Sequence, residues 1–274
     1  MSVDLSEPIC EENLSHAWAK ALLHVVQAGH RAHLPLMISI GGFVGNEPIE
    51  DPVIRKALDT ALRANREGAS TVSETAMLIF PFDFWKLTRR PDIDAFTGLY
   101  MQKYLPRLRA RNRLNARGTY FQRMVSYQGV KCNGGKIVIE PTNQLKHIIE
   151  IWKRDRKNGR RPRRSALQVS CFDPPKDHNG SALSVFPCLQ QVSFGYYEDN
   201  HRSLAVNAYY PTQYVFDRAY GNYLGLCHLG HFMARELDLD LVRFNCFVGC
   251  PELGRVKPKQ IKGLLDLVRE RIPL

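Results

Sequence analysis

The chain has 274 residues, of which 44% are hydrophobic, and it carries a formal net charge of +11. This size allows one large domain with a full core, and no run of about 18 apolar residues predicts a membrane span. The N-terminal segment is acidic and polar and lacks the basic and apolar regions of a signal peptide, so we expect a cytoplasmic protein with no membrane partner. Its seven scattered cysteines are not typical of a disulfide-rich secreted domain.

The first half of the chain shows mainly helical periodicity. Helices are predicted over residues 15–27, 54–67, 71–80 and 143–157, and a short buried strand over 34–40. Pro81 should end the third helix because proline cannot continue a helical hydrogen-bond ladder. Asn143 is a candidate N-cap for the fourth helix.

The second half is rich in Val, Phe and Tyr and favours strands. Strands are predicted over residues 165–172, 188–197, 203–210 and 241–249, and helices over 222–237 and 258–272. Pro258 stands near the first turn of the last helix. No repeat, low-complexity linker or clear boundary divides the chain. The sequence therefore predicts a single α+β domain over residues 1–274, with a large mixed sheet flanked by helices.

Basic residues gather in two segments. Residues 153–164 hold eight basic side chains and one acidic side chain, and residues 107–117 are also rich in arginine. Such surfaces attract the phosphates of nucleotides, nucleic acids or lipids. The alternative for each segment is a solvated helix end and loop.

Two other groupings give little support for a metal site. Cys246 and Cys250 have no second Cys/His pair with zinc-finger spacing, so two cysteines at the end of a strand are the simpler interpretation. His228 and His231 lie one helical turn apart, but no third ligand is evident. We therefore expect no metal.

Three segments together indicate a specific chemistry. They are residues 143–174, which include an Arg-Arg pair, residues 186–194 (FPCLQQVSF), and residues 208–237, which include an Asn-headed helix. Their order and spacing resemble the thymidylate synthase family, in which a Pro-Cys nucleophile lies between the arginine pair and a strand that ends in Gln-Arg-Ser. The resemblance implies a thymidylate synthase-like fold.

The resemblance also implies roles for individual residues. Cys188 matches the nucleophile that adds to C6 of a pyrimidine, and Asn222 matches the asparagine that reads the pyrimidine edge. Thr212 replaces a serine and keeps a hydroxyl for a phosphate. Arg163 and Arg164 match the pair that reaches the phosphate site of the partner subunit.

Three further assignments follow from the same resemblance. His231 lies nine residues after the matched asparagine, as a histidine does in some members of the family. Tyr120 resembles an active-site tyrosine, and Glu74 corresponds to the catalytic glutamate of the N-terminal part.

These residue types suit the chemistry on general grounds. C5 of a pyrimidine is a poor nucleophile, but a thiolate that adds to C6 makes C5 able to attack a one-carbon electrophile. Nearby arginines stabilise a thiolate, and an amide can both donate to and accept from a pyrimidine edge. The resemblance implies 5,10-methylenetetrahydrofolate as the one-carbon donor.

Several positions depart from the family pattern. Pro211 replaces the arginine of Gln-Arg-Ser, Tyr214 replaces an acidic residue near folate, and Leu189 replaces the histidine after the nucleophile. The histidine and tyrosine that hold the sugar fall near Gly249 and Pro251, and the C-terminal sequence differs from the apolar closing tail of the family. These departures argue against ordinary methylation of dUMP.

The leading hypothesis is a homodimeric, thymidylate synthase-like transferase that adds a methyl or hydroxymethyl group to C5 of a pyrimidine nucleotide or nucleoside. One alternative is an inactive subunit of the same fold that binds a nucleotide or a protein partner. Taken singly, Cys188 could be a buried core residue and Asn222 could cap its helix, a role that is compatible with reading the pyrimidine. A third hypothesis, nucleic-acid binding, rests on the net charge of +11 but lacks a recognised RNA- or DNA-binding signature.

Overall fold

The computed structural model describes residues 7–29, 35–65, 69–111, 118–133, 136–178, 187–197 and 202–272. Residues 112–117 of the second basic segment and residues before Pro187 in the Pro-Cys segment lie outside this set. None of the described helices combines enough length with enough apolar character to cross a bilayer.

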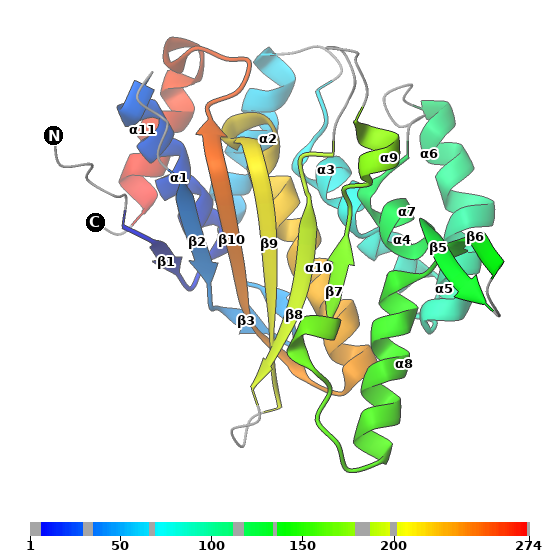
Figure 1. Cartoon of the computed structure of the whole chain (residues 1–274). Helices are drawn as coiled ribbons and strands as arrows, with labels where there is room; N and C mark the ends of the chain where they lie inside the picture. The colour runs from blue at the N-terminus through cyan, green and yellow to red at the C-terminus, as the bar shows by residue number, and fades with distance from the viewer. Residues whose placement is uncertain are drawn as a thin grey trace, which may run out of the picture.

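Within the described residues, a mixed six-stranded sheet forms the centre of the fold (Figure 1). In spatial order its strands are β1 (Ile9–Glu11), β2 (Leu36–Ile40), β10 (Asp240–Glu252), β9 (Ser203–Tyr214), β8 (Gln191–Tyr197) and β7 (Gln168–Ser170). The pairs β1–β2 and β10–β9 are parallel, and the other neighbours are antiparallel. Most of the sheet comes from the second half of the chain, which confirms the prediction.

The remaining described elements are helices and two small ladders. The ladders are β3 (Phe43–Val44) with β4 (Glu47–Pro48), and β5 (Tyr127–Asn133) with β6 (Lys136–Thr142). The α-helices are α1 (Leu14–Ala28), α2 (Pro52–Asn65), α3 (Val72–Ile79), α4 (Phe82–Leu87), α5 (Ile93–Leu99), α6 (Leu105–Arg111), α7 (Tyr120–Val125), α8 (Gln144–Lys157), α9 (Pro174–Asp177), α10 (Tyr220–Leu237) and α11 (Lys262–Arg271). The π-helical turns are η2 (Tyr100–Tyr104) and η5 (Val215–Ala219), and the 3₁₀ turns are η4 (Arg164–Ala166) and η6 (Pro258–Ile261).

Side-chain caps fix the starts of helices α8 and α1. The Asn143 side chain accepts a hydrogen bond from the backbone N–H of Lys146 at 3.0 Å, which confirms it as the N-cap of α8. Asn13 caps α1 in the same way through Ser15 N–H at 2.8 Å. Helix α3 ends at Ile79, before Pro81, as the sequence predicts.

Helix α10 crosses one face of the sheet, and 15 of its 18 residues are buried. Two glycines on this helix allow α3 to approach closely. A Cβ atom at Gly221 would lie 2.5 Å from Cβ of Thr75, and one at Gly225 would lie 2.6 Å from the carbonyl oxygen of Ala76. The close approach places the first turn of α10 directly against the start of α3.

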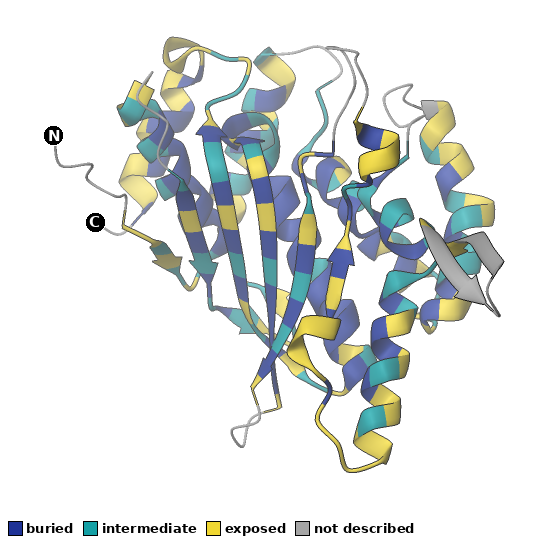
Figure 2. Cartoon of the chain, viewed as in Figure 1, coloured by how far each residue is buried: buried dark blue, intermediate teal, exposed yellow. Residues whose placement is uncertain are grey.

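The opposite face of the sheet is open (Figure 2). One row of paired side chains across this face is polar and contains Ser39, Asn245, Asn207 and Ser193. Asn245 accepts from Ser39 at 2.8 Å and donates to Asn207 at 2.8 Å. The neighbouring row is apolar, with Met37, Phe247 and Tyr209 exposed by 51%, 39% and 41%.

The predicted strands and long helices are confirmed, although the last helix begins as the 3₁₀ turn η6 rather than as α-helix. The sequence analysis did not predict the short helices α4–α7 or the ladder of β5 and β6. Helices α4 and α7 have six residues each, which is too short for a periodic pattern to reveal them. A single connected core takes side chains from α1 through α11.

Candidate active site

Cys188 lies in the turn that leads into β8. This turn is at the end of the sheet where strands β9 and β10 finish. Backbone N–H of Gln190 donates to the carbonyl of Tyr209 at 3.0 Å, and its side chain donates to the carbonyl of Pro187 at 2.6 Å. Pro187 and Leu189 are buried, while Cys188 between them is exposed. The alternative that Cys188 is a buried core residue is therefore wrong.

Two charged residues act on the thiol in opposite directions. Partial loss of hydration raises the pKa of Cys188, the guanidinium of Arg218 lowers it, and the carboxylate of Glu252 raises it, so that the net shift is upward. Arg218 is positioned in part by Thr75, whose hydroxyl lies 3.4 Å from Nη1. The thiol has a cationic neighbour, but the surroundings as a whole favour its protonated form.

Tyr120 is also brought to this turn. Its hydroxyl oxygen lies 3.5 Å from the backbone N–H of Leu189. Burial, followed by the nearby Cys188, raises the pKa of Tyr120 well above its ordinary value. The phenol therefore keeps its proton near neutral pH and can act as a hydrogen-bond donor beside the thiol.

Asn222 is the third residue of α10 and is buried. It does not cap the helix, because Ala219 occupies the N-cap position and η5 runs directly into α10. The capping interpretation is therefore wrong. Arg218 lies one helical turn earlier, so both residues belong to the same end of α10.

Thr212 lies near the end of β9, in register with Cys250 on β10. Its hydroxyl donates to the Glu252 carboxylate at 3.1 Å. A carboxylate at this position repels a phosphate, so the surroundings of Thr212 do not support the phosphate-binding role expected from the sequence.

Glu74 has a structural position instead of the expected catalytic one. It is exposed at the third position of α3, and its carboxylate accepts from the backbone N–H of Thr71 at 2.8 Å. The Thr71 hydroxyl accepts in turn from the backbone N–H of Glu74, which completes a capping box. Among the described residues, its hydrogen bonds are with Thr71, which argues against a catalytic role.

His231 is separated from the Cys188 site. It lies nine residues beyond Asn222 on α10, which corresponds to about 13 Å along the helix axis. The His231 ring makes edge contacts with Phe82 at 5.2 Å and Trp85 at 5.7 Å. The structure therefore places His231 in an aromatic cluster and not beside the nucleophile.

Arg163 and Arg164 lie at the far end of β8. The Arg164 guanidinium stands 5.2 Å from the ring centroid of Tyr196. Tyr196 lies five residue steps along the extended strand from Gln191, a distance of about 17 Å, and Cys188 lies beyond Gln191. Neither arginine can serve the Cys188 site of its own chain.

Three residues near the site were missed by the sequence analysis: Arg218, Glu252 and Gln213. Gln213 is 2% exposed, and its Oε1 accepts from the hydroxyl of Tyr223 at 2.9 Å. Its Nε2 has no hydrogen-bond partner among the described residues. A buried donor without a partner is costly, so Gln213 is a candidate for contact with a ligand or water.

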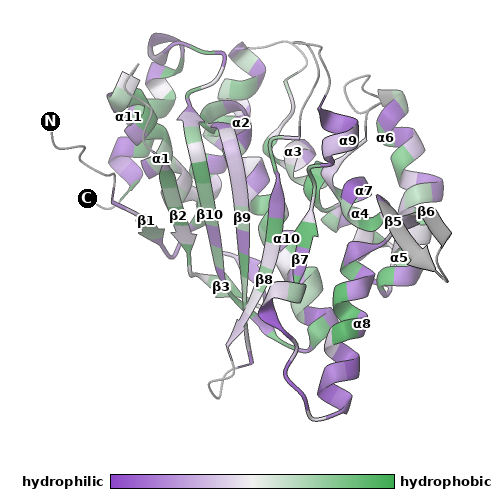
Figure 3. Cartoon of the chain, in the orientation of Figure 1, coloured by the Kyte–Doolittle hydropathy of each residue, from purple (hydrophilic) through white to green (hydrophobic). Residues whose placement is uncertain are grey.

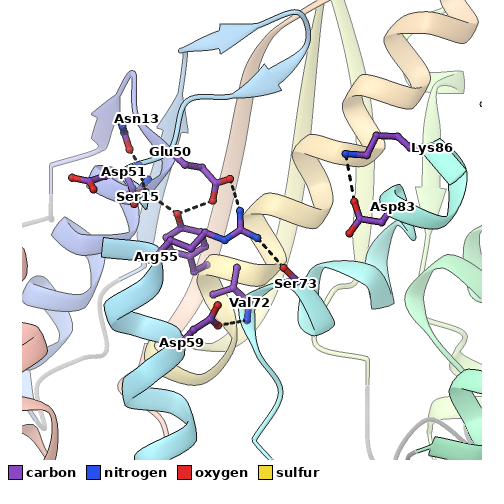
Figure 4. A network of polar contacts seen from close by, with 11 residues as sticks. Asn13, Ser15, Glu50, Asp51, Arg55, Asp59, Val72, Ser73, Asp83 and Lys86 are labelled. Atoms are coloured by element: carbon purple, nitrogen blue, oxygen red, sulfur yellow. Dashed lines mark hydrogen bonds and ion pairs between the residues drawn. The ribbon is translucent and has the colours of Figure 1, made fainter. Parts of the chain in front are cut away.

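A polar network lies behind the start of α10 (Figure 4). Glu50 accepts from the Tyr220 hydroxyl at 2.8 Å and forms an ion pair with Arg55 at 2.7 Å. Arg55 also donates to the hydroxyl of Ser73 at 2.8 Å. The network connects α2, α3 and α10, and so fixes the helix end that carries Arg218 and Asn222.

A second ion pair supports the turn from the other side. Arg123 contacts Asp177 through two hydrogen bonds of 2.6 and 2.8 Å and also donates to the carbonyl of Cys171 at 2.9 Å. Backbone N–H of Cys171 then donates to the carbonyl of Gln190 at 2.8 Å. The position of the Cys188 turn therefore depends on α7 and α9.

The cysteines and histidines of the described part do not gather into a metal site: no group of three or more His, Cys, Asp or Glu side chains there could hold an ion. His228 stacks on Phe82 with ring centroids 4.0 Å apart. Burial, with help from neighbouring positive charge, lowers the pKa of His228 to about 3.

No protein-family model matches the chain, and no curated protein matches its sequence. The geometry of the chain itself therefore carries the functional argument. In the folded chain, five residues from distant parts of the sequence lie together at one end of the strands: Cys188, Arg218, Glu252, Thr212 and Tyr120.

Proposed function

We propose that the protein transfers a one-carbon group to C5 of a pyrimidine nucleotide or nucleoside through a covalent bond between Cys188 and C6. The observation that carries the proposal is the exposed Cys188 thiol at the sheet edge, with the Arg218 guanidinium beside it. The fold supports the proposal, because a buried helix that begins near an asparagine follows the strand next to the nucleophile.

The residues divide the chemistry among them. Arg218 favours the thiolate of Cys188, which adds to C6 and raises the electron density at C5. C5 would then form its new carbon–carbon bond and lose its proton, while the carbon–nitrogen bond to the donor would break. A hydride from the donor would complete a methyl product, or water a hydroxymethyl product, and the thiolate would leave from C6 to restore the ring double bond. Asn222 and Gln213 contribute amide groups suited to the polar edge of a pyrimidine.

The one-carbon donor we propose is 5,10-methylenetetrahydrofolate, which supplies an electrophilic carbon when bound. Tyr214 and Glu252 fit such a donor, since a pterin ring can stack on the exposed Tyr214 ring and donate N–H groups to the carboxylate. Tyr214 replaces an acidic residue of the family, so we expect weaker folate binding than in ordinary thymidylate synthases.

We further propose that the active form is a homodimer in which a second copy covers the open sheet face. The Met37, Phe247 and Tyr209 row would lose its exposed apolar area on association. Arg163 and Arg164 are too distant to serve their own Cys188, and Glu252 opposes a phosphate near Thr212. A phosphate would then need the arginines of the second copy.

Trapping with 5-fluoropyrimidines tests the proposed function, because fluorine at C5 cannot leave as a proton does. We expect 5-fluoro-dUMP or 5-fluorodeoxyuridine, with the folate donor, to add its mass to the peptide that contains Cys188. The exposed Cys10 should remain unmodified and serves as the internal control. Specific binding of both compounds without any adduct would contradict the proposal.

The second candidate is an inactive subunit that binds a nucleotide or a protein partner. It is favoured by one observation: hydration loss and Glu252 together raise the pKa of Cys188 despite Arg218. This candidate predicts that pyrimidine nucleotides raise the melting temperature while C5 of a labelled pyrimidine exchanges no proton.

A further inference from the structure

A groove lies at the far end of α8, away from Cys188. Three adjoining hollows of 460, 550 and 340 Å³ follow the last turns of α8, the loop after it and the end of β8. The groove is lined in part by Trp152, Arg160, Arg161, Tyr196, Tyr197 and Arg202. Figure 3 shows that this end of α8 and the following loop are strongly hydrophilic.

The groove carries a large excess of positive charge. Residues 153–164 contain eight basic side chains and one acidic side chain. Among the described acidic residues near the groove, Asp155 pairs with Arg154, Glu236 with Lys153 and Arg235, and Asp238 with Arg202. Arg160, Arg161, Arg163 and Arg164 are exposed. A polyanion is therefore the ligand that complements this surface.

Specific contacts fix the backbone that presents these arginines. Gly159 adopts a left-handed conformation with φ of +65° after the end of α8. The Tyr196 hydroxyl donates to the carbonyl of Pro162 at 2.6 Å, and Trp152 Nε1 donates to the carbonyl of Leu237 at 2.9 Å. The loop is thus anchored on β8, and the helix α8 that precedes it is anchored on α10.

Of the aromatic residues at the groove, Trp152 and Tyr196 are buried at its base and Tyr197 is exposed. Trp152 and Tyr196 meet edge to face with centroids 5.0 Å apart, and Arg164 lies over Tyr196. Tyr197, the next residue of β8, is 53% exposed and lines the middle hollow. An exposed ring beside guanidinium groups offers stacking for an unpaired base and charge for its phosphates.

We infer that this groove binds single-stranded RNA or DNA along its backbone, without reading a particular sequence. A lipid surface fits less well, because these arginines border hollows that a single strand can enter and the flat surface of a bilayer cannot. The inference does not depend on the proposed catalysis, since groove and nucleophile lie toward opposite ends of β8. It rests on Arg160, Arg161 and Tyr197, because the proposed dimer would place Arg163 and Arg164 at the phosphate site of the second copy.

The test is fluorescence anisotropy with a labelled oligouridylate of about 20 nucleotides, titrated between about 50 and 300 mM KCl. We expect salt-dependent binding by the wild-type chain. Arg160→Glu/Arg161→Glu should reduce the steepness of log K against log salt by about 2, one for each lost phosphate contact. Tyr197→Ala should weaken binding about tenfold and leave this slope unchanged.

The matched control is Lys259→Glu/Lys262→Glu, which makes the same change of charge at exposed sites in η6 and α11. Melting curves first establish that every variant is folded. Equal weakening by the control pair would show a general effect of net charge and overturn the inference. Wild-type affinity in Tyr197→Ala, or tighter binding to anionic lipid vesicles than to the oligonucleotide, would overturn it as well.

Discussion

The Cys188 thiol lies between charges of opposite sign, and its reactivity depends on both. Arg218 arrives from η5 and Glu252 from the end of β10, so neither is close to Cys188 in the sequence. Only the tertiary structure reveals this arrangement. The Pro-Cys pair itself was recognisable in the sequence, and so was Tyr120, which lies beside the same turn.

The two charges predict opposite changes in alkylation. Glu252→Gln removes a charge that raises the pKa of Cys188, so alkylation by iodoacetamide should extend to lower pH. Arg218→Gln removes a charge that lowers this pKa and should move the profile to higher pH. Mass spectrometry follows each cysteine, and the profile of the exposed Cys10 should not move in either variant. Shifts in the same direction for both variants would contradict this electrostatic account.

The buried pair of Arg123 and Asp177 should dominate the stability of the region under the site. Asp177→Asn leaves the half-buried guanidinium without its counterion and should lower the free energy of unfolding by about 3 kcal/mol. Asp83→Asn, in an exposed pair with Lys86, is the control and should cost less than about 1 kcal/mol. Urea denaturation measures both, and equal losses would contradict the assignment.

The same pair predicts how stability changes with pH. Burial raises the pKa of Asp177, but hydrogen bonds from Arg123 and from the backbone of Asp173 outweigh it and hold the pKa below 3.8. The contribution of ionised Asp177 to the free energy of unfolding is therefore complete above its pKa in the unfolded chain. This contribution is lost as the pH falls through its pKa in the folded chain. Asp177→Asn should flatten the decline in stability below about pH 4.

At the scale of elements, helix packing rather than local sequence determines where the site residues lie. Apolar periodicity predicted α1, α2, α3, α8 and α10 because these helices are long enough to show a stripe or a continuous buried run. Glu74 shows the limit of reading roles from position, since Thr-x-x-Glu in 71–74 also matches a capping box and serves as one. The sequence did not show how closely α3 approaches α10.

A substitution at Gly221 tests how closely helix α10 packs against helix α3. A methyl group there meets Thr75 and the Val72 carbonyl at 2.5 and 2.8 Å, so Gly221→Ala should destabilise the fold by about 1–3 kcal/mol. Gly263→Ala in α11 is the control, because its Cβ would meet nothing within 4 Å. Because alanine has a higher helix propensity than glycine, Gly263→Ala should raise the free energy of unfolding by up to about 1 kcal/mol. Urea denaturation measures the stability of both variants. If Gly221→Ala is as stable as or more stable than the wild-type chain, the two helices have room to separate.

At the scale of the whole molecule, the sheet has one covered face and one open face. The richness in Val, Phe and Tyr predicted the strands, but the register that lines up Ser39, Asn245 and Asn207 in one row, and Met37 and Phe247 in the next, required the structure. The homodimer expected from the resemblance is consistent with this open face and stays a prediction.

Sedimentation at micromolar concentration tests the dimer. Phe247→Lys places a charge in the apolar row of the open face and should convert the dimer into a folded monomer. Leu87→Lys changes an even more exposed apolar residue, 81% exposed on α4, and should leave the dimer intact. A monomeric wild-type chain, or dissociation by Leu87→Lys alone, would contradict the proposed interface.

Release of tritium from C5-labelled pyrimidines tests the central claim most directly. The assay detects bond cleavage at C5 whether the product carries a methyl or a hydroxymethyl group, and a panel of uridine and cytidine nucleosides and nucleotides covers the substrate class. We predict release by the wild-type chain with the folate donor, and none by a folded Cys188→Ser variant, because a serine hydroxyl is far less ionised than a thiol. Full tritium release by Cys188→Ser, on a substrate that the wild-type chain also turns over, would contradict the account.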